Sequence, residues 1–112
     1  MSSGFETTDP RGIVIRCDDG CTSYLLQKRP SLRSYIKDIK RAIEQPNHGC
    51  IYRSNHPAHP DRCVYYGYVK GWKAEMRVVV AFNEGMLPFL VSAHPCSKRP
   101  DGEQLIWPIT SQ

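Results

Sequence analysis

The sequence contains no apolar run that could form a membrane-spanning helix. Its longest apolar stretches, such as residues 86–93, are far shorter than the ~20 residues that such a helix needs. The N-terminus, Met-Ser-Ser-Gly-Phe-Glu, also lacks the basic and then apolar pattern of a secretory signal. We therefore predict a cytoplasmic protein that does not act on a membrane.

Paired cysteine motifs are also missing. The five cysteines are odd in number and match no double CxxC pattern, so a complete set of intramolecular disulfides is impossible. We predict reduced thiols, some of which fill small core sites. His56, His59 and Cys63 have a spacing that could suit zinc, but both histidines precede a proline, which equally suits a rigid exposed loop. We predict no metal and no cofactor, with a small zinc-stabilised domain as an alternative.

The chain is long enough for one domain with a core of its own. It has 112 residues, of which 40% are hydrophobic and 23% charged, and these ordinary globular values exclude disorder, coiled coil and collagen. Residues 1–11 are rich in Ser, Thr and Gly, so we predict a flexible N-terminal arm followed by a single domain over residues 12–112.

Positive charge is concentrated in one segment. The net charge is +4, yet residues 28–41 alone carry six basic residues and one acid, and the rest of the chain is close to neutral. Such a patch is typical of a surface that binds a polyanion, and Lys37, Lys40 and Arg41 are its candidate RNA contacts. The alternative is an ordinary solvated helix face.

Apolar periodicity divides the chain into a helical and a strand-rich part. The first elements expected are a short strand at 12–16 and a short helix capped by Thr22 or Ser23; a hairpin is the alternative to this short helix. Apolar residues at steps of three and four then predict an amphipathic helix over residues 31–45. After Gly49 the period becomes two, which predicts strands near 50–54, 62–69, 75–82 and 86–94 and a closing segment at 105–107. We predict an α+β fold: N-terminal helices packed on one face of a four- to five-stranded antiparallel sheet.

Alternation along the strands assigns residues to the two faces of this sheet. Met76, Val78, Val80 and Phe82 are the more apolar set and should face the helix, which leaves Arg77 on the open face. In the next strand the expected core residues are Leu87, Phe89, Val91 and Ala93. Ser92 and His94 should then share the open face with Arg77.

Several short strings in this order of elements resemble the barnase/EndoU/colicin/RelE-like nuclease superfamily, in particular its small phage-associated and polymorphic-toxin members. The matching stretch covers about residues 24–108 and includes Arg29-Pro-Ser-Leu32, Ile36-Lys-Asp-Ile39, Ala42-Ile-Glu-Gln-Pro46, Tyr65-Tyr66, Val78-Val-Val80, Val91-Ser-Ala93 and Glu103 to Trp107. The resemblance implies one or two helices followed by an antiparallel meander, and metal-independent cleavage of RNA. The chain departs from the family where Arg29-Pro30-Ser31 replaces His-Pro-Glu and where Ser92 replaces Thr.

Cleavage of this kind needs proton transfer and stabilisation of charge on the phosphate. His94 is the best titratable candidate, with Ser92 beside it, and the strand arginines Arg77 and Arg53 could hold the phosphate. The alternatives are an inert surface histidine and arginines that pair with Glu75 or Glu84. Arg53 joins the open face only if Tyr52 faces the core, which the pattern leaves open.

The remaining candidates are RNA contacts. Tyr65 could stack on a base, although packing is the alternative, and Lys70 and Lys98 in loops could bind phosphates. We predict a small ribonuclease-like toxin with RNA as substrate and a possible cognate inhibitor protein. The alternative is a non-catalytic module that binds nucleic acid or protein on the same fold.

Overall fold

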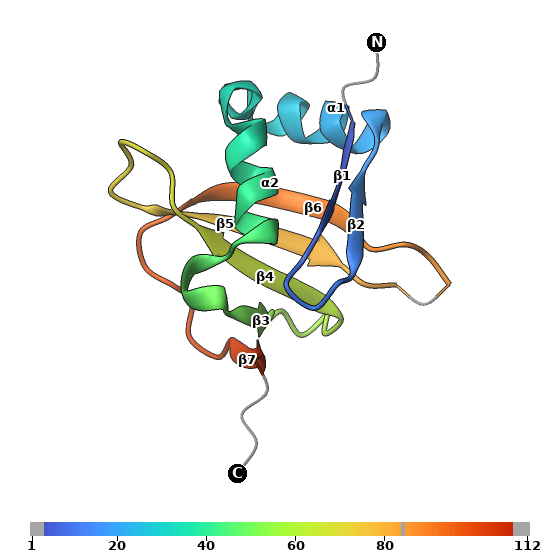
Figure 1. Ribbon diagram of the computed structural model, residues 1–112, viewed down its shortest axis with the longest axis vertical. Helices are drawn as coiled ribbons and strands as arrows, with labels where there is room; N and C mark the ends of the chain where they lie inside the picture. The colour runs from blue at the N-terminus through green and yellow to red at the C-terminus, as the bar shows by residue number, and fades with distance from the viewer. Residues whose placement is uncertain (1–3, 84, 109–112) are drawn as a thin grey trace.

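The computed structural model describes residues 4–83 and 85–108 (Figure 1). Its elements follow in the order β1 (Phe5–Thr8), β2 (Val14–Cys17), α1 (Asp19–Lys28), a 3-10 turn (Pro30–Tyr35), α2 (Ile36–Glu44), a second 3-10 turn (Asn47–Gly49), β3 (Ile51–Arg53), β4 (Arg62–Gly67), β5 (Glu75–Ala81), β6 (Phe89–Cys96) and β7 (Gln104–Trp107). Among the described residues, no helix is long and apolar enough to cross a membrane.

The strands form one curled sheet of seven strands, with β1 and β7 at its two edges. Its order is β1-β2-β6-β5-β4-β3-β7, and the β2–β6 pair is parallel whereas the other pairs are antiparallel. The predicted α+β class and the antiparallel β4–β5–β6 meander are confirmed. The predicted strand number and the wholly antiparallel sheet are wrong, because β1 lies in the expected flexible arm and because β2, expected as a short strand, joins the same sheet through a parallel pair with β6.

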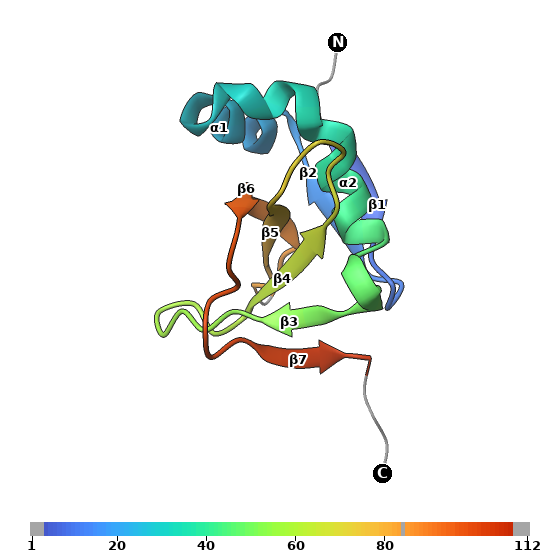
Figure 2. The same ribbon diagram turned by 90° about the vertical axis from the view of Figure 1, so that its left-hand side faces the viewer.

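Part of the predicted N-terminal arm is a strand. Phe5–Thr8 forms β1, which pairs with β2, and Thr7 is buried and donates a hydrogen bond from its hydroxyl to Glu44 on α2 at 2.5 Å. Because β1 depends on these contacts with distant residues, the local sequence Phe-Glu-Thr-Thr by itself predicts a loop. Figures 1 and 2 show that β1 and β2 lie beside α2 and cross the direction of β4–β6 at a steep angle.

The helices do not form a layer on one flat face, which corrects the predicted packing. α2 contacts β4 and β5 on one side and β1 on another, because the sheet curls around it, while α1 lies against β2 and β6. α1 is a helix, as predicted in preference to a hairpin, but its N-cap is Asp18, whose side chain accepts from the Cys21 amide at 2.8 Å, and Thr22 is buried within the helix.

The core lies between α2 and the inner face of β4 and β5. Met76, Val78 and Val80 are fully buried there with Ile39 and Ile43 of α2, which confirms the predicted face of β5. The approach is close at Gly67 of β4, where a Cβ atom would lie 2.5 Å from the Cβ atom of Ala42. Glycine is therefore required at this contact.

A bulge changes the predicted faces of β6. Val79 pairs with Ser92 but Val80 pairs with Leu90, so Val91 is the extra residue. Leu90 and Ala93 are the buried core residues of β6, whereas Leu87 is 52% exposed and precedes the strand. The predicted inward positions of Leu87, Phe89 and Val91 are therefore wrong, and that of Ala93 is confirmed.

Candidate functional site

The open face of the sheet is the side of β4, β5 and β6 that the helices leave uncovered. Arg77 pairs with Tyr66 on one side and with His94 on the other, so these three residues form a row across three strands. Val79 and Ser92 pair in the next row on the same face. The structure thus brings His94, Arg77 and Ser92 together, as the alternation predicts, while their catalytic roles stay a prediction.

The Arg77 guanidinium is held by a carboxylate that sequence reasoning missed. Arg77 Nη2 donates to Glu103 Oε2 at 2.6 Å, and the Tyr66 hydroxyl donates to the other carboxylate oxygen. The side chains of Arg77 and Glu103 are only 12% and 4% exposed. Arg77 Nε is buried and has no hydrogen-bond partner among the described residues. Arg77 is therefore fixed in place and keeps one N–H group unused.

The pKa values of this network follow from its contacts. Burial would lower the pKa of Arg77, but its hydrogen bonds to Glu103 and Tyr66 outweigh burial, and the pKa is raised. Burial, followed by the bond to Glu103, raises the pKa of Tyr66. Arg77 is accordingly a permanent cation and Tyr66 a permanent donor near neutral pH.

A second ion pair covers the same face. Arg99 donates to both carboxylate oxygens of Glu75, at 2.9 and 2.7 Å, and to the Tyr52 hydroxyl at 3.0 Å. Its guanidinium carbon lies 4.2 Å from the centre of the Tyr66 ring. The hydrogen bond from Arg99 is the main cause that lowers the pKa of Glu75. The partner predicted for Arg77 thus belongs to Arg99, and Glu84 lies outside the described residues.

His94 lies close to two positive charges. It is half-buried, and its pKa is lowered from the usual 6.5 by burial first, then by Arg77 and by Arg29. Arg29 follows α1 and is exposed, and within residues 4–83 and 85–108 its side chain forms no ion pair. Neutral His94 can therefore accept a proton beside two guanidinium groups at pH 7.

Two of the predicted site residues lie elsewhere. Tyr52 pairs with Val64 and so faces the open side, which places Arg53 on the opposite face with Cys63. Arg53 lines a separate hollow of about 240 Å³ with Arg11 and Arg62. Tyr65 is fully buried and its hydroxyl donates to Asp9 at 2.8 Å, so it cannot stack on a base. The predicted places of Arg53 and Tyr65 in the RNA site are both wrong, because alternation along β3 and β4 directs these side chains away from the open face.

The basic residues of α2 also lie apart from His94. Lys37 and Arg41 are exposed and Lys40 is half-buried, but α2 packs on the inner face of the sheet and His94 occupies the outer face. Lys70 and Lys98 are exposed in the loops that follow β4 and β6. The structure therefore separates a helical basic surface from the His94 site.

The zinc ligands of the alternative interpretation, His56, His59 and Cys63, do not converge. The rings of His56 and His59 lie 4.9 Å apart, and the Ala58 amide donates to His56 Nδ1 at 3.1 Å, which gives the loop its own internal structure. Cys63 is buried on β4. In the part of the chain that the structure describes, no three His, Cys, Asp or Glu side chains converge as a metal ion requires.

Sequence and structure comparisons add no relative that could guide the assignment of the open face. No protein-family model, curated protein or solved structure matches the chain. The chemistry of this face therefore has to be inferred from its own residues: a neutral imidazole, two nearby guanidinium groups and a hydroxyl from Ser92.

Proposed function

We propose that this protein cleaves RNA at the open face of its sheet by acid/base chemistry, as a small ribonuclease-like toxin of the nuclease superfamily that its sequence resembles. The observation that supports this most is the row of Tyr66, Arg77 and His94 across three strands, in which the half-buried His94 has its pKa lowered by burial and then by Arg77 and Arg29. An anion is the ligand that such a surrounding favours, because Arg29 forms no ion pair among the described residues, whereas Arg77 is already paired with Glu103.

In the proposed reaction, neutral His94 takes the proton from a ribose 2′-hydroxyl. The 2′-oxygen bonds to the adjacent phosphorus, the bond from phosphorus to the 5′-oxygen breaks, and the leaving oxygen takes a proton from water. Arg29 donates to the phosphate oxygens as negative charge builds up, and the positive charge of Arg77, which Glu103 holds in place beside His94, adds to the stabilisation. The products are a 2′,3′-cyclic phosphate and a 5′-hydroxyl.

Glu103 and Tyr66 position the arginine rather than touch RNA. Glu103 holds one edge of the Arg77 guanidinium and Tyr66 holds Glu103, so the group cannot rotate away from His94. Fixed donors need no reorganisation when charge develops, and this makes them effective in a transition state.

The replacement His94→Ala tests the proposal. We expect cleavage of a cellular RNA mixture to fall by roughly 100-fold or more, as for the loss of a general base, with RNA affinity nearly unchanged. His59→Ala, in an exposed loop, is the matched control and should keep full activity. A chelator should leave the rate unchanged, since the proposed groups are all side chains. A fully active His94→Ala variant would refute the assignment.

The second candidate function is RNA binding without cleavage. Two observations favour it: Arg77 is already neutralised by Glu103, and the basic surface of α2 lies on the other side of the sheet. If RNA binds to α2, replacing Lys37, Lys40 and Arg41 by Ala should weaken binding and reduce the salt slope by nearly ~1 for each lost phosphate contact. Unchanged binding would identify these residues as a solvated face. Failure of the folded wild-type protein to cleave any RNA would favour this second function.

A further inference from the structure

Two of the five cysteines lie in direct contact where β2 meets α1. Cys17 is the last residue of β2, Asp18 is the N-cap of the helix, and Cys21 lies in its first turn. The two sulfur atoms are 2.7 Å apart. Sulfurs in contact need only a short further approach to reach the bond length of a disulfide, about 2.05 Å.

The two thiols behave as one acid. The hydrogen bond with Cys21 is the main cause that lowers the pKa of Cys17, with a further contribution from the Thr22 hydroxyl at 3.4 Å, while burial opposes both. The same sulfur–sulfur bond, followed by burial, raises the pKa of Cys21. Cys17 is therefore the sulfur that loses its proton more readily. The pair therefore supplies a thiolate more readily than a buried cysteine would alone.

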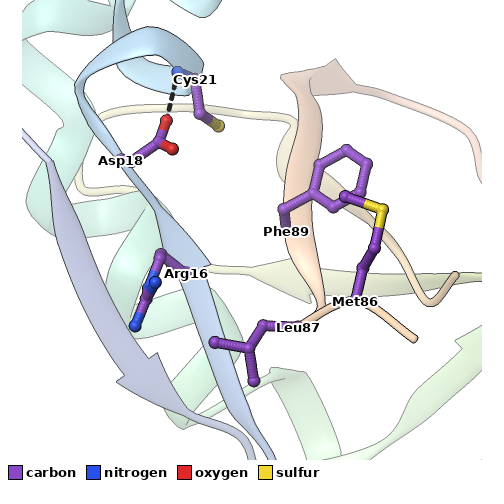
Figure 3. Close-up of a pocket in the computed structure, with 6 residues that line it drawn as sticks. All are labelled: Arg16, Asp18, Cys21, Met86, Leu87 and Phe89. Atoms are coloured by element: carbon purple, nitrogen blue, oxygen red, sulfur yellow. Dashed lines mark hydrogen bonds between the residues drawn. The ribbon is translucent and has the colours of Figure 1, made fainter. Parts of the chain in front are cut away.

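Only one of the two sulfurs can meet a small molecule. Cys17 has no exposed surface, whereas Cys21 is partly exposed and lines a hollow of about 420 Å³. Arg16, Met86 and Phe89 form other parts of this wall (Figure 3). Figure 3 shows the Cys21 side chain on the side of Phe89, which agrees with its 3.1 Å hydrogen bond to the Leu90 carbonyl. A peroxide can enter here and reach Cys21.

We propose that Cys17 and Cys21 are a redox-active pair that hydrogen peroxide converts to a reversible disulfide. Transfer of the Cys21 proton to the Cys17 thiolate across the 2.7 Å contact leaves Cys17 as the donor and Cys21 as the exposed thiolate. The Cys21 sulfur attacks one peroxide oxygen, the O–O bond breaks, and the departing hydroxide takes a proton and leaves as water. The Cys17 thiolate then attacks the Cys21 sulfur, the S–O bond breaks, and the second hydroxide takes the remaining proton. Two thiols lose two electrons and two protons, and the peroxide becomes two waters.

The other cysteines lie in different surroundings. Cys50 and Cys96 donate to the carbonyl oxygens of His48 and Lys98, at 3.4 and 3.2 Å, and Cys63 is buried on β4, where burial raises its pKa. Among the described residues, only Cys17 and Cys21 bring two sulfurs together, so oxidation should be confined to this pair.

The experiment counts thiols in the folded wild-type protein before and after a brief exposure to hydrogen peroxide. After denaturation and alkylation with N-ethylmaleimide, the untreated chain should carry five adducts and the oxidised chain three, with a loss of about 2 Da before alkylation. Dithiothreitol should restore five adducts. Peptide mapping should place the bridge between Cys17 and Cys21.

Two variants complete the test. Cys21→Ser should keep its four thiols under the same exposure, and the double variant Cys50→Ser/Cys96→Ser should still lose two thiols. Because peptide mapping on the wild type needs no substitution, a variant that fails to fold does not decide the question. Five adducts in the peroxide-treated wild type, or a bridge between any other cysteines, would overturn the proposal.

Discussion

The two faces of the sheet are built from the same strands but stabilised in opposite ways. On β5, Met76, Val78 and Val80 point to the helix and lie in a dry apolar core, whereas the alternate residues Glu75 and Arg77 point outward into ion pairs. The inner face depends on shape and buried area, whereas the outer face adds ion pairs to a smaller buried cluster of Val64, Tyr66 and Val79. A substitution should therefore act through packing on the inner face, and an unpaired charge is an additional cost on the outer face.

The largest effect on stability should come from breaking the buried ion pair of the outer face. Glu103→Leu leaves the Arg77 guanidinium buried without its carboxylate, and we expect the free energy of unfolding to fall by about 3–5 kcal/mol in urea denaturation. The double variant Arg77→Met/Glu103→Leu removes both charges and should recover most of this loss. A single variant as stable as the wild type would show that the outer face is not stabilised by this pairing.

A smaller effect is expected on the inner face, where shape decides. Gly67→Ala places a methyl group 2.5 Å from the Cβ atom of Ala42, so β4 and α2 must separate, at a cost of about 1–3 kcal/mol. Adding Ala42→Gly removes the closest of these contacts and leaves the Cα atom of residue 42 at 3.0 Å. A double-mutant cycle should then show a favourable coupling of at least about 0.5 kcal/mol, and additive losses would contradict the close contact.

The smallest effect is the pH dependence that His94 adds to the outer face. Because its pKa is lower in the folded protein than the usual 6.5, the unfolded chain binds more protons as the pH falls below about 7.5. Its contribution to stability is present above 6.5 and is lost as the pH falls through the folded pKa. His94→Gln should lack this part of the acid destabilisation.

The replacement Arg29→Gln tests whether a nearby cation lowers the pKa of His94. Removing this cation should raise the pKa of His94 towards 6.5, measured by NMR titration of its ring protons, because one of the three causes of the shift is gone. The acid limb of kcat/KM for RNA cleavage should move in the same direction. Lys73→Gln, an exposed change in the loop before β5, is the control and should leave the titration unaltered. An unchanged His94 pKa in Arg29→Gln would contradict an electrostatic interaction between Arg29 and His94.

The sequence predicts what local alternation controls. The inward set on β5 and the shared face of Arg77, Ser92 and His94 follow from parity alone. Parity fails at Val91, since a bulge is a property of the pairing with β5 and has no signal in the string Phe-Leu-Val-Ser-Ala. The face of Arg53 was open because three residues of β3 have no clear apolar alternation.

Contacts between residues far apart in the sequence cannot be predicted from local alternation. Glu103 and Arg99 belong to the polar segment between β6 and β7, where composition indicates only a loop, yet both fold back onto the outer face to bind Arg77 and Glu75. The helix was expected over 31–45, but its first turns are a 3-10 segment before α2. The contact between Cys17 and Cys21 likewise depends on how β2 turns into α1.

The parallel pairing of β2 with β6 has a consequence for the order in which the chain folds. The hairpins of the β3–β6 meander connect near neighbours in sequence, whereas Arg16 must find Phe89, which closes a loop of roughly 70 residues. Contacts at such separation slow folding and form after local ones. We expect the meander with α2 to form first and the β1–β2 hairpin to dock last, so that the hollow beside Cys21 exists only in the completed fold.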